Sequence, residues 1–205
     1  NNLGNIYKDL EQPESAIKSY KKAIEIKPDF VQAHNNLGNI YKDLEQPESA
    51  IQSYKKAIEI KPDFAEAYYN LGVSLKKVRK LEESINCFKR AIEINSEFAE
   101  AYNNLGNCFT LLGHMVSAIN YYKKATSINP SYDDALNNLG NVLNITGKVN
   151  QGVKCFERAI KINPEFAEAH NSLGNAFKKL KPVSYTHLRA HETDSYLVCR
   201  LLLEK

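Results

Sequence analysis

Apolar and polar residues follow each other along this chain in a pattern that returns every 34 residues. Each copy contains two stretches whose apolar residues recur at three- and four-residue steps, the spacing of one face of an α-helix. In the copy from Asn35 to Tyr68, these steps predict a first helix over residues 33–44 and a second over residues 47–60. Pro47 suits the first position of the second helix, where its missing N–H is not needed, and Pro62 should stop that helix.

The copies begin near residues 1, 35, 69, 103, 137 and 171, and the last one stops after a single helix. A fixed period of this length is typical of stacked helical units that contact only their neighbours. The sequence therefore predicts an all-α protein over residues 1–181, a right-handed superhelix of five helix pairs and one extra helix.

Small and large residues hold fixed places in the repeat. A glycine follows a leucine in every copy, at Gly4, Gly38, Gly72, Gly106, Gly140 and Gly174. Because glycine inside a helix costs about 1 kcal/mol relative to alanine, its recurrence indicates the close approach of another helix. The second helix carries an aromatic column at Tyr20, Tyr54, Phe88, Tyr122 and Phe156. We expect large and small residues of neighbouring helices to interlock.

These columns resemble the tetratricopeptide repeat, a helix–turn–helix unit of the same period. Its signature is matched in order and spacing by Leu37, Gly38, Tyr41, Ala50, Tyr54, Ala57 and Pro62. The tryptophan often seen at its start is replaced by His34, Tyr68, Tyr102, Leu136 or His170. The resemblance covers residues 1–180 and implies an α-solenoid, a fold that hosts many functions.

Two glycines in the later copies lead to separate expectations. Gly113 lies in the turn between two helices, where a left-handed backbone favours glycine. Gly152 replaces the alanine usual in the second helix, so we expect a small gap there and the softest repeat of the array. On this interpretation, Gly152→Ala should stabilise the protein by about 0.5–1 kcal/mol.

Composition narrows the range of partners. The net charge of +3 is spread over interspersed acidic and basic residues, and no basic stripe indicates nucleic-acid binding. No apolar run approaches the roughly 20 residues of a membrane-spanning helix, and no signal peptide is apparent. Because the chain begins within a helical pattern and without methionine, we interpret it as a fragment at its N-terminus.

The cysteines and histidines indicate structure rather than chemistry. Cys87, Cys108 and Cys155 have no metal-ligand spacing, and reduced thiols in helices favour an intracellular, cytoplasmic location, with the nucleus as an alternative. His34 and His170 share a column at the edge of the core, where packing is expected. The sequence shows no nucleophile–base pair, phosphate loop or metal set, so we expect no catalytic residue, metal or cofactor in this segment. Whether the parent protein is an enzyme stays open.

Residues 182–205 do not continue the repeat. Val183–Thr193 resembles the translation of a transposase-type sequencing adapter, and Tyr196–Lys205 resembles the primer that follows it. We therefore interpret residues 182–205 as a non-native read-through tail; the alternative is a diverged last helix. An apparent zinc half-site at His187 and His191 falls within this tail.

The opposite face of each first helix carries the candidate binding residues. At about 100° per residue, two asparagine columns point directly away from the Leu–Gly–Tyr face. The peptide-binding candidates are Asn2, Asn36, Asn70, Asn104 and Asn138 in the first column, and Asn39, Asn107 and Asn141 in the second. Val73 interrupts the second column, and Ser172 closes the first.

An asparagine amide offers donors and an acceptor, so it can pair with the N–H and C=O groups of a passing peptide backbone. Packed helices lie about 8–10 Å apart and an extended chain advances about 3.3 Å per residue, so one asparagine would meet roughly every third peptide residue. On this hypothesis, alanine variants of Asn70, Asn104 and Asn138 should fold normally and bind peptide more weakly. The alternative is that both columns are inherited repeat consensus on a solvated face.

We expect the array to be a protein–protein interaction scaffold that holds an extended peptide or partner. The resemblance adds an alternative, because first helices line the groove of tetratricopeptide arrays, and an asparagine ladder there resembles the substrate-recognition arm of peptide O-GlcNAc transferases. In that case the catalytic domain is missing from this fragment. A carboxylate clamp for chaperone C-termini needs Lys or Arg where this chain has Asn35, Tyr69 and Asn103, which disfavours that class.

Overall fold

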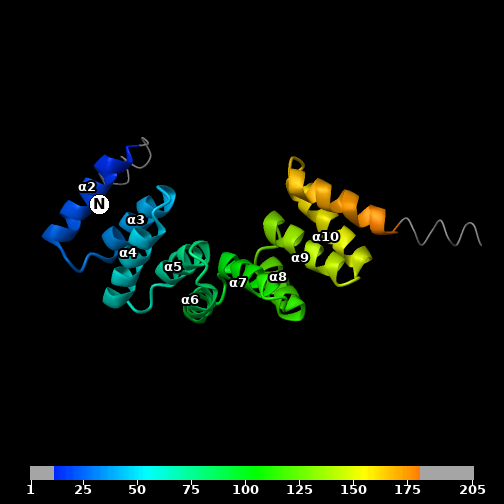
Figure 1. Cartoon of the computed structure of the whole chain (residues 1–205), viewed down its shortest axis with the longest axis horizontal. Helices are drawn as coiled ribbons and strands as arrows, with labels where there is room; N and C mark the ends of the chain where they lie inside the picture. Colours follow the sequence, from blue (N-terminus) through cyan, green and yellow to red (C-terminus); the bar gives the residue numbers. More distant parts are fainter. Residues whose placement is uncertain (1–11, 181–205) are drawn as a thin grey trace, which may run out of the picture. The chain divides into compact units, whose positions relative to one another are not determined.

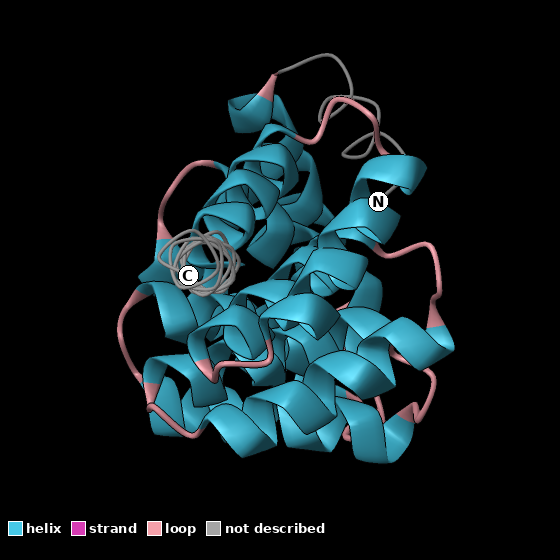
Figure 2. Cartoon of the chain, turned by 90° about the vertical axis from the view of Figure 1, so that its right-hand side faces the viewer, coloured by secondary structure: helices cyan, strands magenta, loops and turns pink. Residues whose placement is uncertain are grey.

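The computed structural model describes residues 12–180, and every regular element within them is an α-helix (Figure 2). The helices are α2 (Pro13–Ile26), α3 (Val31–Asp43), α4 (Pro47–Ile60), α5 (Ala65–Lys77), α6 (Leu81–Ile94), α7 (Ala99–Leu111), α8 (Met115–Ile128), α9 (Asp133–Ile145), α10 (Val149–Ile162) and a further helix over residues 167–180. The predicted all-α class is confirmed. The first residues of the array and the proposed tail, residues 182–205, lie outside the described residues.

The chain forms two compact units that meet in sequence between Gly113 and His114. Unit 1 contains α2 to α7, coloured blue to green in Figure 1. Unit 2 contains α8, α9, α10 and the helix over residues 167–180. Each unit is a run of helices that pack in chain order, as the repeat predicts.

The prolines set the helix ends that the sequence predicts. Helix α4 begins at Pro47 and ends at Ile60, which are the predicted limits. Lys61 has an extended backbone with φ −130° and ψ 92°, as expected of a residue that precedes a proline. Helix α3 begins at Val31, two residues earlier than predicted, because the pattern alone does not fix where the connecting loop ends.

In three helix pairs, a glycine of the first helix lies directly against an aromatic ring of the second. A Cβ atom added at Gly38 would lie 2.5 Å from Cε1 of Tyr54. The corresponding distances are 2.7 Å from Gly72 to Phe88 and 2.5 Å from Gly140 to Phe156. The close approach that the glycine column predicts is therefore confirmed in these pairs, and its cause is the ring of the aromatic column.

The cores connect successive repeats as well as the two helices of a pair. The first cluster joins α2 to α3 and consists of Ala16, Tyr20, Leu37 and Ile40. The next joins α4 to α5 and consists of Ala50, Tyr54, Leu71 and Leu75. In unit 2, a cluster of Leu136, Ala159 and Ala169 joins α9, α10 and the helix over residues 167–180. Each repeat thus completes the apolar surface of its neighbour.

The turn between the two helices of a pair requires a left-handed backbone. Gly113 and Gly147 have φ values of 77° and 81° at this position, so the expectation for Gly113 is confirmed. Earlier repeats place Glu45 and Arg79 there, at φ 58° and 63°. A side chain in this conformation costs free energy that glycine avoids.

The expected gap at Gly152 is wrong. A Cβ atom at this position would lie 2.8 Å from the backbone oxygen of Gly140, which is closer than van der Waals contact. In the third repeat the same place is held by Ser84, whose Oγ donates a hydrogen bond of 2.7 Å to the oxygen of Gly72. Helices α9 and α10 therefore come very close together at this column, which is possible because Gly152 has no side chain.

We expect Gly152→Ala to lower the free energy of unfolding by about 1 kcal/mol, because overpacking costs about 1–3 kcal/mol and helix propensity returns up to about 1 kcal/mol. Gly174→Ala is the matched control, since nothing lies within 4 Å of its added Cβ, and it should stabilise. Urea unfolding of both variants measures the difference. Equal stabilisation by the two substitutions would contradict the contact with Gly140.

Arg79→Gly should raise the free energy of unfolding by about 0.5–1 kcal/mol, because the cost of a left-handed residue, about 1–2 kcal/mol, exceeds the entropy that glycine adds to the unfolded chain. The reciprocal control, Gly147→Ala, places a side chain at the same turn and should destabilise. The midpoint of urea unfolding reports both changes. A loss of stability in Arg79→Gly would show that the Arg79 side chain itself stabilises the turn.

Candidate functional site

The peptide-binding candidates differ in exposure. Asn36, Asn39, Asn107, Asn138 and Asn141 are half-buried. Asn70 and Asn104 are only 7% and 9% exposed. The expectation that both columns face away from the packed surface is therefore wrong for Asn70 and Asn104. Asn2 lies outside the described residues.

Asn70 connects α5 to the preceding first helix, α3. Its Nδ2 donates a hydrogen bond of 3.4 Å to Oδ1 of Asn35, a side chain that is 3% exposed. Asn35 in turn donates from Nδ2 to Oε1 of Glu66, at 3.3 Å. The buried amide of Asn35 thus has both its donor and its acceptor engaged by the next repeat, as buried polar groups require.

Asn104 makes the same kind of connection from α7 to α5. Its Nδ2 donates to the hydroxyl oxygen of Tyr69, at 3.3 Å, and to the backbone oxygen of Glu100, at 3.1 Å. Its Oδ1 accepts from Nζ of Lys76, at 2.6 Å. Partial burial lowers the pKa of the Lys76 ammonium. We call Asn70 and Asn104 junction amides, because each joins its own first helix to the preceding one.

The second column is governed by the aromatic residue of its repeat. The hydroxyl of Tyr54 donates to Oδ1 of Asn39, at 2.8 Å, and burial raises the pKa of that phenol. The third repeat has Phe88 in place of the tyrosine and Val73 in place of the asparagine. The third repeat therefore combines an apolar ring with an apolar residue, so no asparagine of the second column lacks a tyrosine hydroxyl there.

The fifth repeat breaks this rule, because Asn141 is combined with Phe156. Phe156 has no hydroxyl to donate, and Asn141 has no hydrogen-bond partner in the part of the chain that the structure describes. Asn141 is half-buried on α9. Of the candidates within residues 12–180, it is the one whose amide is uncommitted.

Sequence reasoning missed the column that receives the junction amides. Its members in the described residues are Asn35, Tyr69, Asn103, Asn137 and Asn171; Asn35, Asn103 and Asn137 are buried, Tyr69 is half-buried and Asn171 is exposed. In the sequence, Asn35, Tyr69 and Asn103 stand out only as positions where a carboxylate clamp would need a cation. The available signal was that each is polar and directly precedes a member of the first asparagine column.

The amides of α9 leave hydrogen-bonding capacity unused. Oδ1 of Asn137 and Oδ1 of Asn144 are buried and have no hydrogen-bond partner among residues 12–180. With Asn141 they follow one another at four- and three-residue steps, so the three side chains lie on one stripe of α9. We call these residues the α9 amide stripe.

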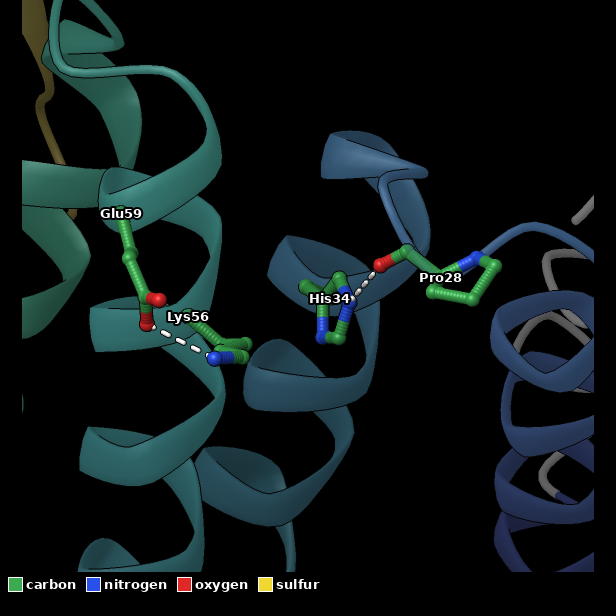
Figure 3. Close-up of polar contacts among 4 residues, drawn as sticks. All are labelled: Pro28, His34, Lys56 and Glu59. Atoms are coloured by element: carbon green, nitrogen blue, oxygen red, sulfur yellow. Dashed lines mark hydrogen bonds and ion pairs between the residues drawn. The ribbon is translucent and has the colours of Figure 1, made fainter.

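The histidines have structural roles. Nε2 of His34 donates to the backbone oxygen of Pro28, at 2.9 Å, which ties the start of α3 to the preceding loop (Figure 3). His170 makes the same contact with Pro164, at 2.9 Å. The packing interpretation is confirmed for His34, which is 8% exposed, whereas His170 is exposed and shows only the hydrogen bond. The second contact in Figure 3, Lys56 to Glu59 at 2.8 Å, is an exposed ion pair within α4 and contributes little.

The described cysteines are free thiols. Burial raises the pKa of Cys87 to about 11 and also raises those of Cys108 and Cys155, so all three favour the protonated, unreactive form at neutral pH. Within residues 12–180, no group of three or more His, Cys, Asp and Glu side chains could hold a metal ion. His187 and His191 lie outside the described residues. No described helix is long and apolar enough to cross a membrane.

Asn104→Ala should lower the free energy of unfolding by about 1–3 kcal/mol, because it leaves the half-buried ammonium of Lys76 and the hydroxyl of Tyr69 without a partner. This replaces the expectation that the junction amides are dispensable for folding. Asn141→Ala is the matched control and should change stability by less than about 0.5 kcal/mol, since its amide has no partner to lose. Thermal unfolding compares them, and a fully stable Asn104→Ala variant would show that the connection between α5 and α7 is not needed.

Family models cover most of the chain. Models described as tetratricopeptide repeat match residues 65–98, 99–132 and 121–154. A model described as TPR repeat matches residues 4–45, 38–78 and 140–181. No curated protein matches the chain.

Solved structures show the same architecture. The crystal structure of MamA is 31% identical, with a TM-score of 0.73, and the match covers 81% of this chain and 97% of that one. YrrB, a TPR protein with an unusual peptide-binding site, is 24% identical, with a TM-score of 0.68 and coverage of 83% and 88%. MamA from Desulfovibrio magneticus RS-1 is 16% identical, with a TM-score of 0.72 and coverage of 81% and 94%. The last two show the fold alone. By its family-model matches and its identity to MamA, this chain belongs to the tetratricopeptide repeat family.

Proposed function

We propose that this protein is a protein-interaction scaffold that holds an extended peptide segment of a partner against the faces of its first helices. The observation that carries the proposal is Asn141, a half-buried amide on a first helix whose donors and acceptor are uncommitted within the described residues. The described part of the fold makes no use of this amide, and its partial exposure leaves it accessible to a ligand. A peptide backbone supplies the complementary N–H and C=O groups.

The α9 amide stripe has dimensions that suit an extended chain. Asn137 and Asn144 are separated by seven residues, which is about 10.5 Å along the helix axis. An extended peptide advances about 3.3 Å per residue, so roughly three of its residues pass along this distance. Three amides with unused acceptors over this length support recognition of a backbone rather than of one side chain.

In unit 1 the asparagine side chains have two different roles. Asn70 and Asn104 support the helices on which the binding face stands, through the bonds described above. Asn36, Asn39 and Asn107 are half-buried and each has a partner within the fold, so we propose that only their remaining exposed atoms contact a peptide in unit 1, and those of Asn138 do so in unit 2. Asn2 would extend the same column. The exposed side chain of Leu111, at 70%, adds an apolar contact at the end of α7.

A recognition arm of a peptide O-GlcNAc transferase is the alternative that the asparagine columns suggest. The amides of Asn70 and Asn104 are engaged inside the chain, so they lend that alternative no support. The interpretation of residues 182–205 as a read-through tail also stays a proposal, and sequencing of the locus tests it.

The binding proposal is tested by Asn141→Ala. One neutral hydrogen bond is worth about 0.5–1.5 kcal/mol, so the dissociation constant of unstructured peptides should rise about two- to tenfold, and by a similar factor for different peptide sequences. Fluorescence anisotropy with a panel of labelled peptides measures it. Asn150→Ala on α10 is the control, because this exposed asparagine lies on the second helix of the same repeat and should leave binding unchanged. An identical affinity for Asn141→Ala and the parent would remove the basis of the proposal.

A further inference from the structure

The junction between α9 and the helix over residues 167–180 lacks an amide that unit 1 possesses. In unit 1, Asn70 and Asn104 each reach back to the preceding first helix. The repeat places Ser172 at the corresponding position. Serine ends at Oγ, one bond beyond Cβ, and carries no NH₂ group, so it cannot reproduce that connection.

The groups that the missing amide would have served are unpaired. Asn137 corresponds to Asn35, whose Oδ1 accepts from Asn70 and whose Nδ2 donates to Glu66. Asn137 is 7% exposed, and its Oδ1 has no hydrogen-bond partner in the part of the chain that the structure describes. Glu168, which corresponds to Glu66, has neither a hydrogen bond nor an ion pair within residues 12–180. The same contact network is therefore complete in unit 1 and open in unit 2.

The surroundings of this junction are rich in acceptors. Asp133 and Asp134 begin α9, and Glu168 lies at the start of the next first helix. Partial burial raises the pKa of Asp134, and the carboxylates of Asp133 and Glu168 raise it further. Side chains three or four residues apart on a helix share a face and lean towards its N-terminus, which directs Asn137 towards Asp133 and Asp134. No cation in the described part of the chain pairs with Asp134 or Glu168.

Helix electrostatics account for only part of this arrangement. Acidic side chains in a first helical turn are favoured by the helix dipole, so Asp133 and Asp134 need no ligand to explain them. The dipole does not explain the buried Oδ1 of Asn137, which requires an N–H or O–H donor. Because Asp134 and Glu168 are acceptors as well, the complementary group should carry several donors, and the carboxylates favour a positive charge on it.

The chain itself contains an example of this chemistry. Nζ of Lys76 donates to Oδ1 of Asn104 at 2.6 Å, so an ammonium satisfies an asparagine carbonyl at a junction of this kind. We propose, building on the peptide-binding function, that the junction of α9 with the helix over residues 167–180 binds a basic side chain of the peptide, which donates to Oδ1 of Asn137 and to the carboxylates of Glu168 and Asp134. The guanidinium of arginine fits best, because its planar fork serves several acceptors at once. The χ2 torsion of asparagine has a broad energy well, which lets Asn137 turn its oxygen towards an entering donor.

The test uses the full chain, labelled with ¹⁵N, and three blocked peptides, acetyl-Gly-Ser-X-Ser-Gly-amide with X as arginine, lysine or glutamine. The arginine peptide should bind the parent about tenfold more tightly than the glutamine peptide, with shifts in the NMR signals of Asn137 and Ser172. The preference should shrink as salt is raised from about 10 mM, where the screening length is about 30 Å, to about 100 mM, where it is about 10 Å. Lysine should lie between the other two.

Two substitutions of Ser172 test whether the open junction binds a ligand or is only an incompletely filled part of the fold. Ser172→Asn restores the junction amide, so it should raise the unfolding temperature and reduce the arginine preference to about twofold or less. Ser172→Ala removes the hydroxyl without filling the place, so it should retain the preference. Glu168→Gln, which removes a charge from an exposed side chain, should weaken arginine binding about two- to fivefold. Loss of the preference in Ser172→Ala with its retention in Ser172→Asn would overturn the inference.

The reciprocal variant in unit 1 gives an independent measurement. Asn70→Ser opens the contact network of Asn35 and Glu66, so it should destabilise unit 1 and create a second set of arginine-dependent shifts at Asn35. Equal binding of the arginine and glutamine peptides by the parent would show this inference to be wrong and leave the peptide-binding function standing. Absence of binding by all three peptides would overturn both. Arginine binding that leaves Asn137 and Ser172 unshifted would also contradict the inference.

Discussion

The contact between a glycine of one helix and an aromatic ring of its partner sets the distance on which the described helix pairs depend. A Cβ atom at Gly38 would lie 2.5 Å from the ring of Tyr54, well inside van der Waals contact, so the two helices can approach this closely only because the side chain is absent. The same constraint recurs at Gly72 and Gly140 with phenylalanine rings. A spacing that recurs in this way lets units of one period stack.

The aromatic ring also decides what happens on the opposite face of the first helix. The hydroxyl of Tyr54 donates a hydrogen bond to Asn39, whereas a phenylalanine has no hydroxyl and cannot make this bond. The choice between tyrosine and phenylalanine therefore decides whether a hydroxyl is present to pair with the asparagine. Beside Phe156, Asn141 of α9 has no hydrogen-bond partner within residues 12–180.

The junction amides show how a polar column can be structural in one place and functional in another. In unit 1 their donors and acceptors are spent between first helices, and burial makes those bonds necessary. In unit 2 a serine interrupts the series and leaves buried carbonyl oxygens beside three carboxylates. The proposed preference for a basic side chain at this junction thus follows from the exchange of an asparagine for Ser172 at one repeated position.

The repeat period, the prolines and the apolar steps were sufficient to determine the all-α fold, the helix limits at Pro47 and Ile60, and the close contact at the glycines. These features depend on local sterics and on spacings that recur in the sequence. The same local rules gave a wrong prediction for Gly152, where the backbone of Gly140 occupies the expected gap. They were also wrong for Asn70 and Asn104, which a single helix places on its solvent-facing side but which are buried. A helical wheel describes one isolated helix and leaves out the neighbouring repeat. The neighbouring repeat buries these amides and supplies Asn35, Tyr69 and Lys76 as their partners. Only the tertiary structure could show which asparagines are engaged, because hydrogen-bond satisfaction depends on pairs of residues that lie 28–35 positions apart in the chain.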